Sequence, residues 1–191
     1  MKNELIAKLK ATLINASDGA AEVLMSHFGN LKEIAYKGEV NLVTEADKNA
    51  EKAVIEIIRA DFPDHAILAE EGGGAATESA EFRWIIDPLD GTTNYAHGLP
   101  IFSVSIGLEH AGRIIMGRVK APAIGETYFA EHGHGATLNG RPIHVSHVAE
   151  IRKALAATGF GYDRHEQPEH YVAYLHEFLR DSQDIRRGGC A

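Results

Sequence analysis

Residues 84–94 constrain the fold of this chain more than any other segment. They begin with a short apolar run and continue as Asp87-Pro88-Leu89-Asp90-Gly91. An apolar run of this length is typical of a buried strand. Pro88 fixes the backbone and keeps the Leu89 carbonyl out of a regular ladder. The segment therefore predicts a buried strand that presents two carboxylates and one carbonyl oxygen at its C-terminal end.

Two amphipathic helices are predicted before this strand. Apolar residues recur every three or four positions over residues 4–28, and again from about Thr44, a good N-cap residue, to Asp61. Gly19 is a candidate for a bend in the first helix. Lys37 is expected in the loop that joins the two helices.

The remaining pattern is mostly that of strands. Residues 66–69 form a second buried strand that ends in Glu70, and the region after Pro100 indicates an antiparallel meander. Asn139-Gly140 is a strong hairpin signal. We expect strands at residues 66–69, 82–87, 102–108, 113–120, 126–131, 142–145 and 153–158, an exposed mobile loop at 72–79, a helix at 168–179 and a short strand near Ile185. The chain is thus predicted to be one mixed α/β domain over residues 1–191.

Composition excludes several classes of function. The chain carries 19 Lys and Arg against 27 Asp and Glu, a net charge of −8. Because it has no basic block, nucleic acid is not expected as a direct ligand. No apolar run approaches the ~18 residues that a membrane span requires. Cys190 is the single cysteine, so an intrachain disulfide is impossible and the expected compartment is the cytoplasm.

The predicted strand end has the chemistry of a hard-metal site. Asp87, Asp90 and the Leu89 carbonyl supply oxygen ligands, which suit Mg²⁺ or Mn²⁺ and not zinc or copper. Gly91 and Thr92 follow as the start of a short helix, whose free N–H groups suit a phosphate. Taken alone, however, an Asp-Pro-x-Asp-Gly segment is more often a plain turn with an N-capping aspartate.

The rest of the chain reverses that interpretation, because residues 84–100 closely resemble the signature of the inositol monophosphatase family. That family belongs to a superfamily of metal-dependent, lithium-sensitive phosphomonoesterases. Further segments agree in order and spacing over essentially the whole chain: Lys37-Gly38, residues 41–47, residues 68–71, Gly133-x-Gly135-Ala136, Asn139-Gly140-Arg141-Pro142 and Ile185-Arg186-Arg187-Gly188.

The resemblance implies a role for each matched residue. Metal would be held by Glu70, Asp87, the Leu89 carbonyl and Asp90. Catalysis would involve Glu70, Thr92 and Asp47, the last two orienting the attacking water. Substrate would be bound by Asp90, Gly91, Thr92, Cys190 and Ala191. Taken singly, Asp47 is better explained as a first-turn helix acid and Glu70-Glu71 as an ordinary solvated strand end. The Arg186-Arg187 pair has two interpretations: it approaches a phosphate, or, as is more common, it binds carboxylates at a strand end.

The resemblance also implies the fold and the reaction. The expected fold is an α/β (α+β) protein, a layered α-β-α-β sandwich of the sugar phosphatase type. The expected reaction is hydrolysis of inositol 1-phosphate, or of a related small polyol or sugar phosphate, by water that two or three Mg²⁺ ions (or Mn²⁺) activate. A cytoplasmic homodimer is implied, with a small phosphorylated substrate as partner.

One departure from the family pattern is expected to matter. Family members continue beyond the position of Ala191 with a Trp-Asp motif, whose aspartate completes the second metal site. We therefore expect this chain to lack the C-terminal portion of the family fold and to bind the second metal weakly. Two alternatives stay open: another phosphatase of the superfamily, such as a fructose 1,6-bisphosphatase, or a catalytically weak protein that binds a partner in transcription.

Overall fold

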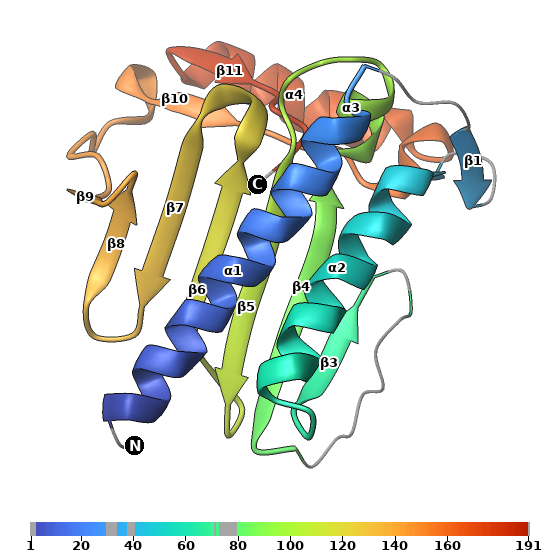
Figure 1. Cartoon of the computed structure of the whole chain (residues 1–191). Helices are drawn as coiled ribbons and strands as arrows, with labels where there is room; N and C mark the ends of the chain where they lie inside the picture. Colours follow the sequence, from blue (N-terminus) through green and yellow to red (C-terminus); the bar gives the residue numbers. More distant parts are fainter. Residues whose placement is uncertain (1–2, 30–33, 38–40, 71, 73–79, 191) are drawn as a thin grey trace.

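The computed structural model describes residues 3–29, 34–37, 41–70, 72 and 80–190, without the side chains of residues 34–44 and Tyr162. Two long helices, α1 (Asn3–His27) and α2 (Glu45–Asp61), lie side by side across one face of a large sheet (Figure 1). Both helices were predicted with nearly these bounds. Helix α1 is continuous through Gly19, where a Cβ atom would lie 3.0 Å from the Cδ1 of Ile57 in α2. Gly19 therefore permits close helix packing and is not the site of a break.

The main sheet has seven strands in the order β3-β4-β5-β6-β7-β8-β9. Strands β3 and β4 are parallel, and every later pair is antiparallel, so the predicted meander is confirmed. The turn between β8 and β9 is the predicted hairpin, and Asn139 and Gly140 both have positive φ. The strands are β3 (Ala66–Ala69), β4 (Phe82–Asp90), β5 (Ser103–His110), β6 (Arg113–Ala121), β7 (Glu126–Glu131), β8 (Gly135–Leu138) and β9 (Arg141–Ile143).

Several smaller elements complete the chain. A short helix, α3 (Thr92–Ala96), follows β4, and α4 (Pro168–Asp181) is the last helix. Strands β1 (Ile34–Lys37) and β2 (Asn41–Thr44) form an antiparallel pair, whereas β10 (Leu155–Ala157) and β11 (Asp184–Arg186) form a parallel one. Single turns of 3-10 helix are η1 (Pro122–Ile124), η2 (Ile151–Lys153) and η3 (Tyr162–His165). In Figure 1, β10, β11 and α4 lie at the end of the sheet toward which β4 points.

Some predicted boundaries were wrong. Strand β4 continues past Asp87 to Asp90, because pairing with β5 resumes after an irregularity. Residues 153–158 are not one strand: a 3-10 turn ends at Lys153, whose N–H donates to the Glu150 carbonyl, and only Leu155–Ala157 pair. Residue 37 ends a strand and is not in an irregular loop. The loop predicted at residues 72–79 lies almost entirely outside the described residues.

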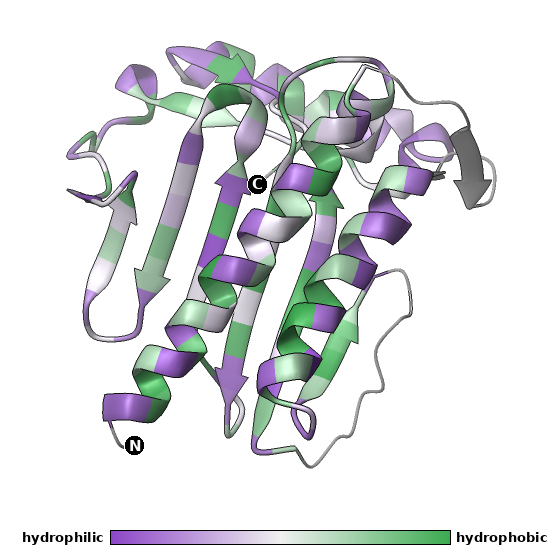
Figure 2. Ribbon diagram, in the orientation of Figure 1, coloured by the Kyte–Doolittle hydropathy of each residue, from purple (hydrophilic) through white to green (hydrophobic). Residues whose placement is uncertain are grey.

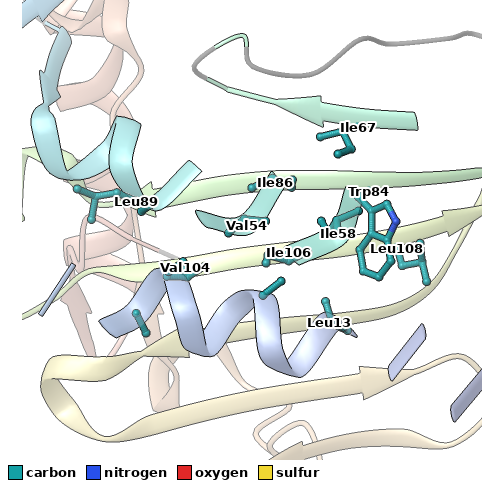
Figure 3. Packing of buried hydrophobic residues seen from close by; sticks show 14 of the residues in the cluster. Leu13, Val54, Ile58, Ile67, Trp84, Ile86, Leu89, Val104, Ile106 and Leu108 are labelled. Carbon is teal, nitrogen blue, oxygen red and sulfur yellow. The ribbon is translucent and has the colours of Figure 1, made fainter. Parts of the chain in front are cut away.

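The core lies between the helix pair and the sheet. Leu13 of α1, Val54 and Ile58 of α2, and Trp84 and Ile106 of the sheet are almost completely buried and point into one cluster (Figure 3). The hydropathy colouring shows the same division, because the apolar stripe of each helix faces the strands and the polar stripe faces outward (Figure 2). This packing fixes β4, and so the position of the residues at its C-terminal end.

Replacing Leu13 by alanine is expected to lower the free energy of unfolding by about 2–5 kcal/mol, because it leaves a cavity between α1 and the sheet. Urea titration followed by circular dichroism measures the change. Leu179→Ala in α4 is the matched control, since this leucine is 62% exposed and the same truncation there is expected to cost under about 0.5 kcal/mol. Equal losses in the two variants would contradict the assignment of the core.

In the described part of the chain, none of the helices combines the length and hydropathy of a bilayer-crossing segment.

Candidate metal and phosphate site

A cavity of about 450 Å³ lies where the parallel strands β3 and β4 end. Parallel strands bring their C-terminal ends to one edge of a sheet, and ligand sites of α/β proteins commonly form there. A volume of this size is typical of small-molecule sites. The described residues that line the cavity are Glu70, Asp87, Leu89, Asp90, Gly91, Thr92, Thr93, Thr158, Gly159, Phe160, Arg164, Arg187, Gly189 and Cys190.

The end of β4 has the irregular backbone that Pro88 predicts. Asp87 pairs with Ser105 and Asp90 with Ser103, so two residues of β4 face one residue of β5. The Leu89 side chain is buried in the core, and its carbonyl accepts a hydrogen bond of 3.0 Å from the Thr92 hydroxyl. The bulge thus turns the Leu89 carbonyl away from the ladder and toward the start of α3.

Three carboxylates influence one another in the cavity. Burial, together with the negative charges of Glu70 and Asp90, raises the pKa of Asp87 to about 7. A hydrogen bond with Glu70 also raises this pKa, because two carboxyl groups can share a bond only if one of them keeps a proton. A hydrogen bond from the Leu89 N–H to Asp87 Oδ1, 3.2 Å long, lowers the pKa of Asp87 and so opposes these effects in part. The cluster therefore favours an added positive charge at neutral pH.

The donor set fits Mg²⁺ by its chemistry, since it consists of carboxylate and carbonyl oxygens. Within the described residues, however, no three His, Cys, Asp or Glu side chains are arranged as a complete metal cage. Mg²⁺ does not need one, because it keeps several waters and commonly binds through one or two carboxylates. Glu70 is exposed and lies within hydrogen-bonding reach of Asp87, so the two carboxyl groups are close enough to act on one cation.

Gly91 connects β4 to α3 in a conformation that other residues adopt with difficulty. Its φ is 94°, and a Cβ atom there would lie 3.0 Å from the Ile101 carbonyl oxygen and 3.2 Å from the Cys190 Cβ. Thr92 begins the helix that was predicted after Gly91. Both the left-handed backbone and the close packing therefore require glycine at this position.

Gly91→Ala is accordingly expected to lower the free energy of unfolding by about 1–3 kcal/mol, through backbone strain and the contacts just described. The matched control is Gly98→Ala: Gly98 has a φ of 73°, but a Cβ there would meet nothing within 4 Å. Urea titration of both variants separates backbone strain, which they share, from crowding at the cavity. A smaller loss for Gly91→Ala than for Gly98→Ala would contradict the crowding.

Asn94 joins two parts of the cavity wall that are far apart in sequence. Its buried side-chain amide donates to the Ile101 carbonyl at 2.7 Å and to the Gly188 carbonyl at 2.9 Å. The second bond ties the segment after β11 to α3, and so brings Cys190 beside Gly91. Burial and the charge of Asp90 raise the pKa of the Cys190 thiol, which therefore stays protonated at neutral pH.

One predicted site residue, Asp47, lies apart from this group. Asp47 is in the first turn of α2 and only 4% exposed. Burial, and to a smaller extent the charge of Asp47, raises the pKa of Tyr95 to about 12. Asp47 is not among the described residues that line the cavity. Ala191 lies outside the described residues.

The structure also adds residues that the sequence did not indicate. Thr158, Phe160 and Arg164 line the cavity although they belong to no recognisable motif. The Arg186-Arg187 pair is divided: Arg186 binds Asp184, as predicted for a strand end, whereas Arg187 lines the cavity. For Arg187 the sequence offered the basic dipeptide and the match of residues 185–188 to the family pattern, and neither says which of the two arginines faces the cavity.

Comparison with known proteins gives one consistent result. The model of the inositol monophosphatase family matches residues 6–191. Among curated proteins, the chain is 40% identical over 182 residues to the chloroplastic phosphatase IMPL1 of Arabidopsis thaliana, covering 92% of this chain and 49% of that protein. It is 43% identical to the inositol-1-monophosphatase of Synechocystis, covering 90% of this chain and 60% of that one. It therefore spans about half to three-fifths of the length of these two relatives.

Two further matches extend the comparison. A putative Nus factor SuhB of Neisseria meningitidis is 36% identical, and the match covers 94% of this chain and 70% of that protein. Among solved structures, the extragenic suppressor protein SuhB of Bartonella henselae superimposes with a TM-score of 0.89 at 33% identity, covering 96% of this chain and 71% of that one. These similarities confirm the predicted mixed α/β fold of the family.

Proposed function

The chain belongs to the inositol monophosphatase family, and on that premise we propose that it contributes the metal-binding and phosphate-binding part of a Mg²⁺-dependent phosphomonoesterase. The proposed substrate is inositol 1-phosphate or a related small polyol or sugar phosphate. The observation that carries this proposal is the cavity at the ends of β3 and β4, where Glu70, Asp87 and Asp90 meet Thr92. The mutual effect of the three carboxylates supports a site for a cation.

Glu70, Asp87, Asp90 and the Leu89 carbonyl would hold the Mg²⁺ ions. Bound Mg²⁺ supplies Lewis-acid stabilisation of phosphoryl oxygens and a more acidic water. The Leu89 carbonyl has two lone pairs, so it can accept the Thr92 hydroxyl bond and still ligate. Sensitivity to Li⁺, a homodimeric assembly and a cytoplasmic location are part of the same proposal.

Residues at the start of α3 would bind the phosphate. The backbone N–H groups of Gly91 and Thr92 are donors for phosphoryl oxygens, and they are fixed before substrate arrives by the geometry of the turn. Thr92 would orient the attacking water, because its hydroxyl is held at 3.0 Å from the Leu89 carbonyl. Asp47 is proposed as the second residue that orients water, and Cys190 and Ala191 as contacts for the alcohol portion of the substrate.

The test is release of inorganic phosphate from inositol 1-phosphate by the 191-residue chain, with Mg²⁺ varied and Li⁺ added. Turnover that requires Mg²⁺ and is inhibited by Li⁺ would support the proposal. If Mg²⁺ binds but no phosphomonoester is hydrolysed, the metal site stands and the activity proposed for this chain does not. Absence of Mg²⁺ binding would overturn the metal site itself.

A second candidate function is binding of a partner in transcription. It is favoured by one observation, the similarity to a relative named as a putative Nus factor. Asp90→Asn discriminates the two candidates, because it removes a proposed ligand without changing the surface elsewhere. If a strain that lacks the gene is complemented equally well by the Asp90→Asn chain, partner binding and not hydrolysis is the function under selection.

A further inference from the structure

Two arginines give the cavity a cationic part that the proposed metal and phosphate residues do not explain. Arg164 comes from η3 and Arg187 follows directly after β11, whereas the carboxylates come from the ends of β3 and β4. The same cavity is therefore lined by acidic residues on one set of elements and by basic residues on another. The hydrolysis proposed above gives no role to either arginine.

Each of the two guanidinium groups makes one local contact that influences its direction. Arg164 donates from Nη1 to the Gly161 carbonyl at 3.2 Å. The Arg187 guanidinium lies over the ring of Phe160, with its Cζ atom 6.0 Å from the ring centroid, at the outer limit of a cation–π contact. Phe160 is itself packed edge-to-face against Tyr171 of α4, at 5.7 Å between centroids. The two side chains are thus directed by contacts that leave most of their N–H donors available.

Neither arginine has a carboxylate partner among the described residues. Within the described residues, no carboxylate lies within 4 Å of Arg164 or Arg187, although Glu70, Asp87 and Asp90 line the same cavity. Arg186 shows the contrast: it is the direct neighbour of Arg187, and its Nη1 lies 2.5 Å from Asp184 Oδ2. Arg164 and Arg187 have no carboxylate partner among the described residues, although an acidic cluster lines the same cavity. Two such arginines have the features of a subsite for an anion.

From this arrangement we propose that Arg164 and Arg187 form a second anion subsite, and that the preferred substrates are phosphorylated polyols or sugars with a second anionic group. The inference rests on the proposed function, because it assumes that the phosphate to be cleaved occupies the start of α3. The second group, a phosphate or a carboxylate, is then held by the guanidinium fork of Arg187 with Arg164. The phosphate to be cleaved would then meet the Mg²⁺ ions and the N–H groups at the start of α3, and the second anionic group would meet the two guanidinium groups.

Initial rates with three matched six-carbon substrates test the proposal: glucitol 6-phosphate, glucitol 1,6-bisphosphate and gluconate 6-phosphate. We expect kcat/KM to be about 10-fold or more higher for a substrate with a second anionic group than for glucitol 6-phosphate, as for a charge-assisted hydrogen bond. A larger increase in kcat/KM for the bisphosphate would indicate a phosphate subsite, and a larger increase for gluconate 6-phosphate would indicate a carboxylate subsite. The gain is expected mainly in KM, since the subsite lies away from the reacting phosphorus.

The variants are Arg164→Gln and Arg187→Gln, with Arg186→Gln as the control that removes one charge outside the cavity. Arg164→Gln and Arg187→Gln should lower kcat/KM for the two substrates with a second anionic group much more than for glucitol 6-phosphate, and so abolish the preference, whereas Arg186→Gln should keep it. No preference in the parent chain, or an equal loss on all three substrates, would overturn the subsite while the phosphatase stands.

Calorimetric titration keeps the two proposals separable if no substrate is turned over. With Mg²⁺ present, the parent chain should bind glucitol 1,6-bisphosphate about 10-fold more tightly than glucitol 6-phosphate, and the Arg164→Gln/Arg187→Gln chain should not. That result would support the subsite although hydrolysis had failed. Equal binding of the two compounds by the parent chain would overturn the subsite by itself.

Discussion

Replacing Asp87 by asparagine is expected to lower Mg²⁺-dependent phosphate release at least about 100-fold, while the chain stays folded. Asp87 lies at the centre of the acidic cluster, where it interacts with both Glu70 and Asp90. Asparagine removes the charge that would hold the metal. It keeps the oxygen that accepts the Leu89 N–H, and its NH₂ group can donate to Glu70.

Stability should therefore change in the opposite direction to activity. At pH 8 the parent chain carries three negative charges in the cluster, and Asp87→Asn carries two, so without metal the variant should unfold at a higher urea concentration. Asp64→Asn, at an exposed turn outside the cavity, is the matched control and should change neither quantity. Activity of Asp87→Asn close to that of the parent chain would remove Asp87 from the proposed metal site.

Periodicity was enough to predict the two helices and the antiparallel part of the sheet. Leu9, Leu13, Ala16, Ala20 and Leu24 recur at helical spacing, and all of them are fully buried against the sheet. In the meander, each strand pairs with its neighbour in sequence, so its order follows from the turns between strands. These features depend on local pattern, which a sequence displays directly.

The strand boundaries around the site were harder to predict because long-range pairing decides them. Proline at position 88 suggested that the strand would end at Asp87, but β5 pairs again with Asp90 beyond the bulge. Likewise, β3 and β4 are parallel neighbours across a segment of twelve residues, 70–81, and no local signal states that they pair. It was this pairing that brought Glu70 to the carboxylates of β4.

The arginines show a different limit of sequence reasoning. Arg186 and Arg187 have the same chemistry and adjacent positions, yet one binds Asp184 and the other lines the cavity. Adjacent side chains of an extended segment point to opposite sides, and which side faces the cavity depends on how β11 pairs with β10. Arg164 lies in a 3-10 turn without periodicity, so nothing near it in sequence marked it as a cavity residue.

The affinity of the chain for Mg²⁺ is expected to rise about 50-fold between pH 5 and pH 7, because the cation must displace a proton. Burial and the charges of Glu70 and Asp90 raise the pKa of Asp87 to about 7, so this carboxyl is protonated at pH 5. Calorimetric titration with MgCl₂, in buffers of different ionisation enthalpy, measures both the affinity and the number of protons released. Close to one proton should be released for each Mg²⁺ bound at pH 5, and almost none at pH 8.

Without metal, the same shift gives the stability a definite pH dependence. Asp87 has an ordinary pKa of 3.8 when unfolded, so between about pH 4 and pH 7 the folded chain binds a proton that the unfolded chain has released. Stability therefore falls as pH rises through this window. His65 acts in the opposite sense: burial lowers its pKa, so its contribution to stability is lost as pH falls below about 6.5. Asp87→Asn should remove the first effect and keep the second.

Saturating Mg²⁺ should cancel the fall caused by Asp87, since a cation that binds only the folded chain stabilises it by an amount that grows with the logarithm of its affinity. The rise in Tm on adding Mg²⁺ is thus expected to be large at pH 8, small at pH 5 and nearly absent at both in Asp87→Asn. Thermal unfolding of the two chains at the two pH values, in EDTA and in MgCl₂, measures all of these differences. A Mg²⁺ effect of equal size at pH 5 and pH 8, or one that survives in Asp87→Asn, would place the cation away from Asp87.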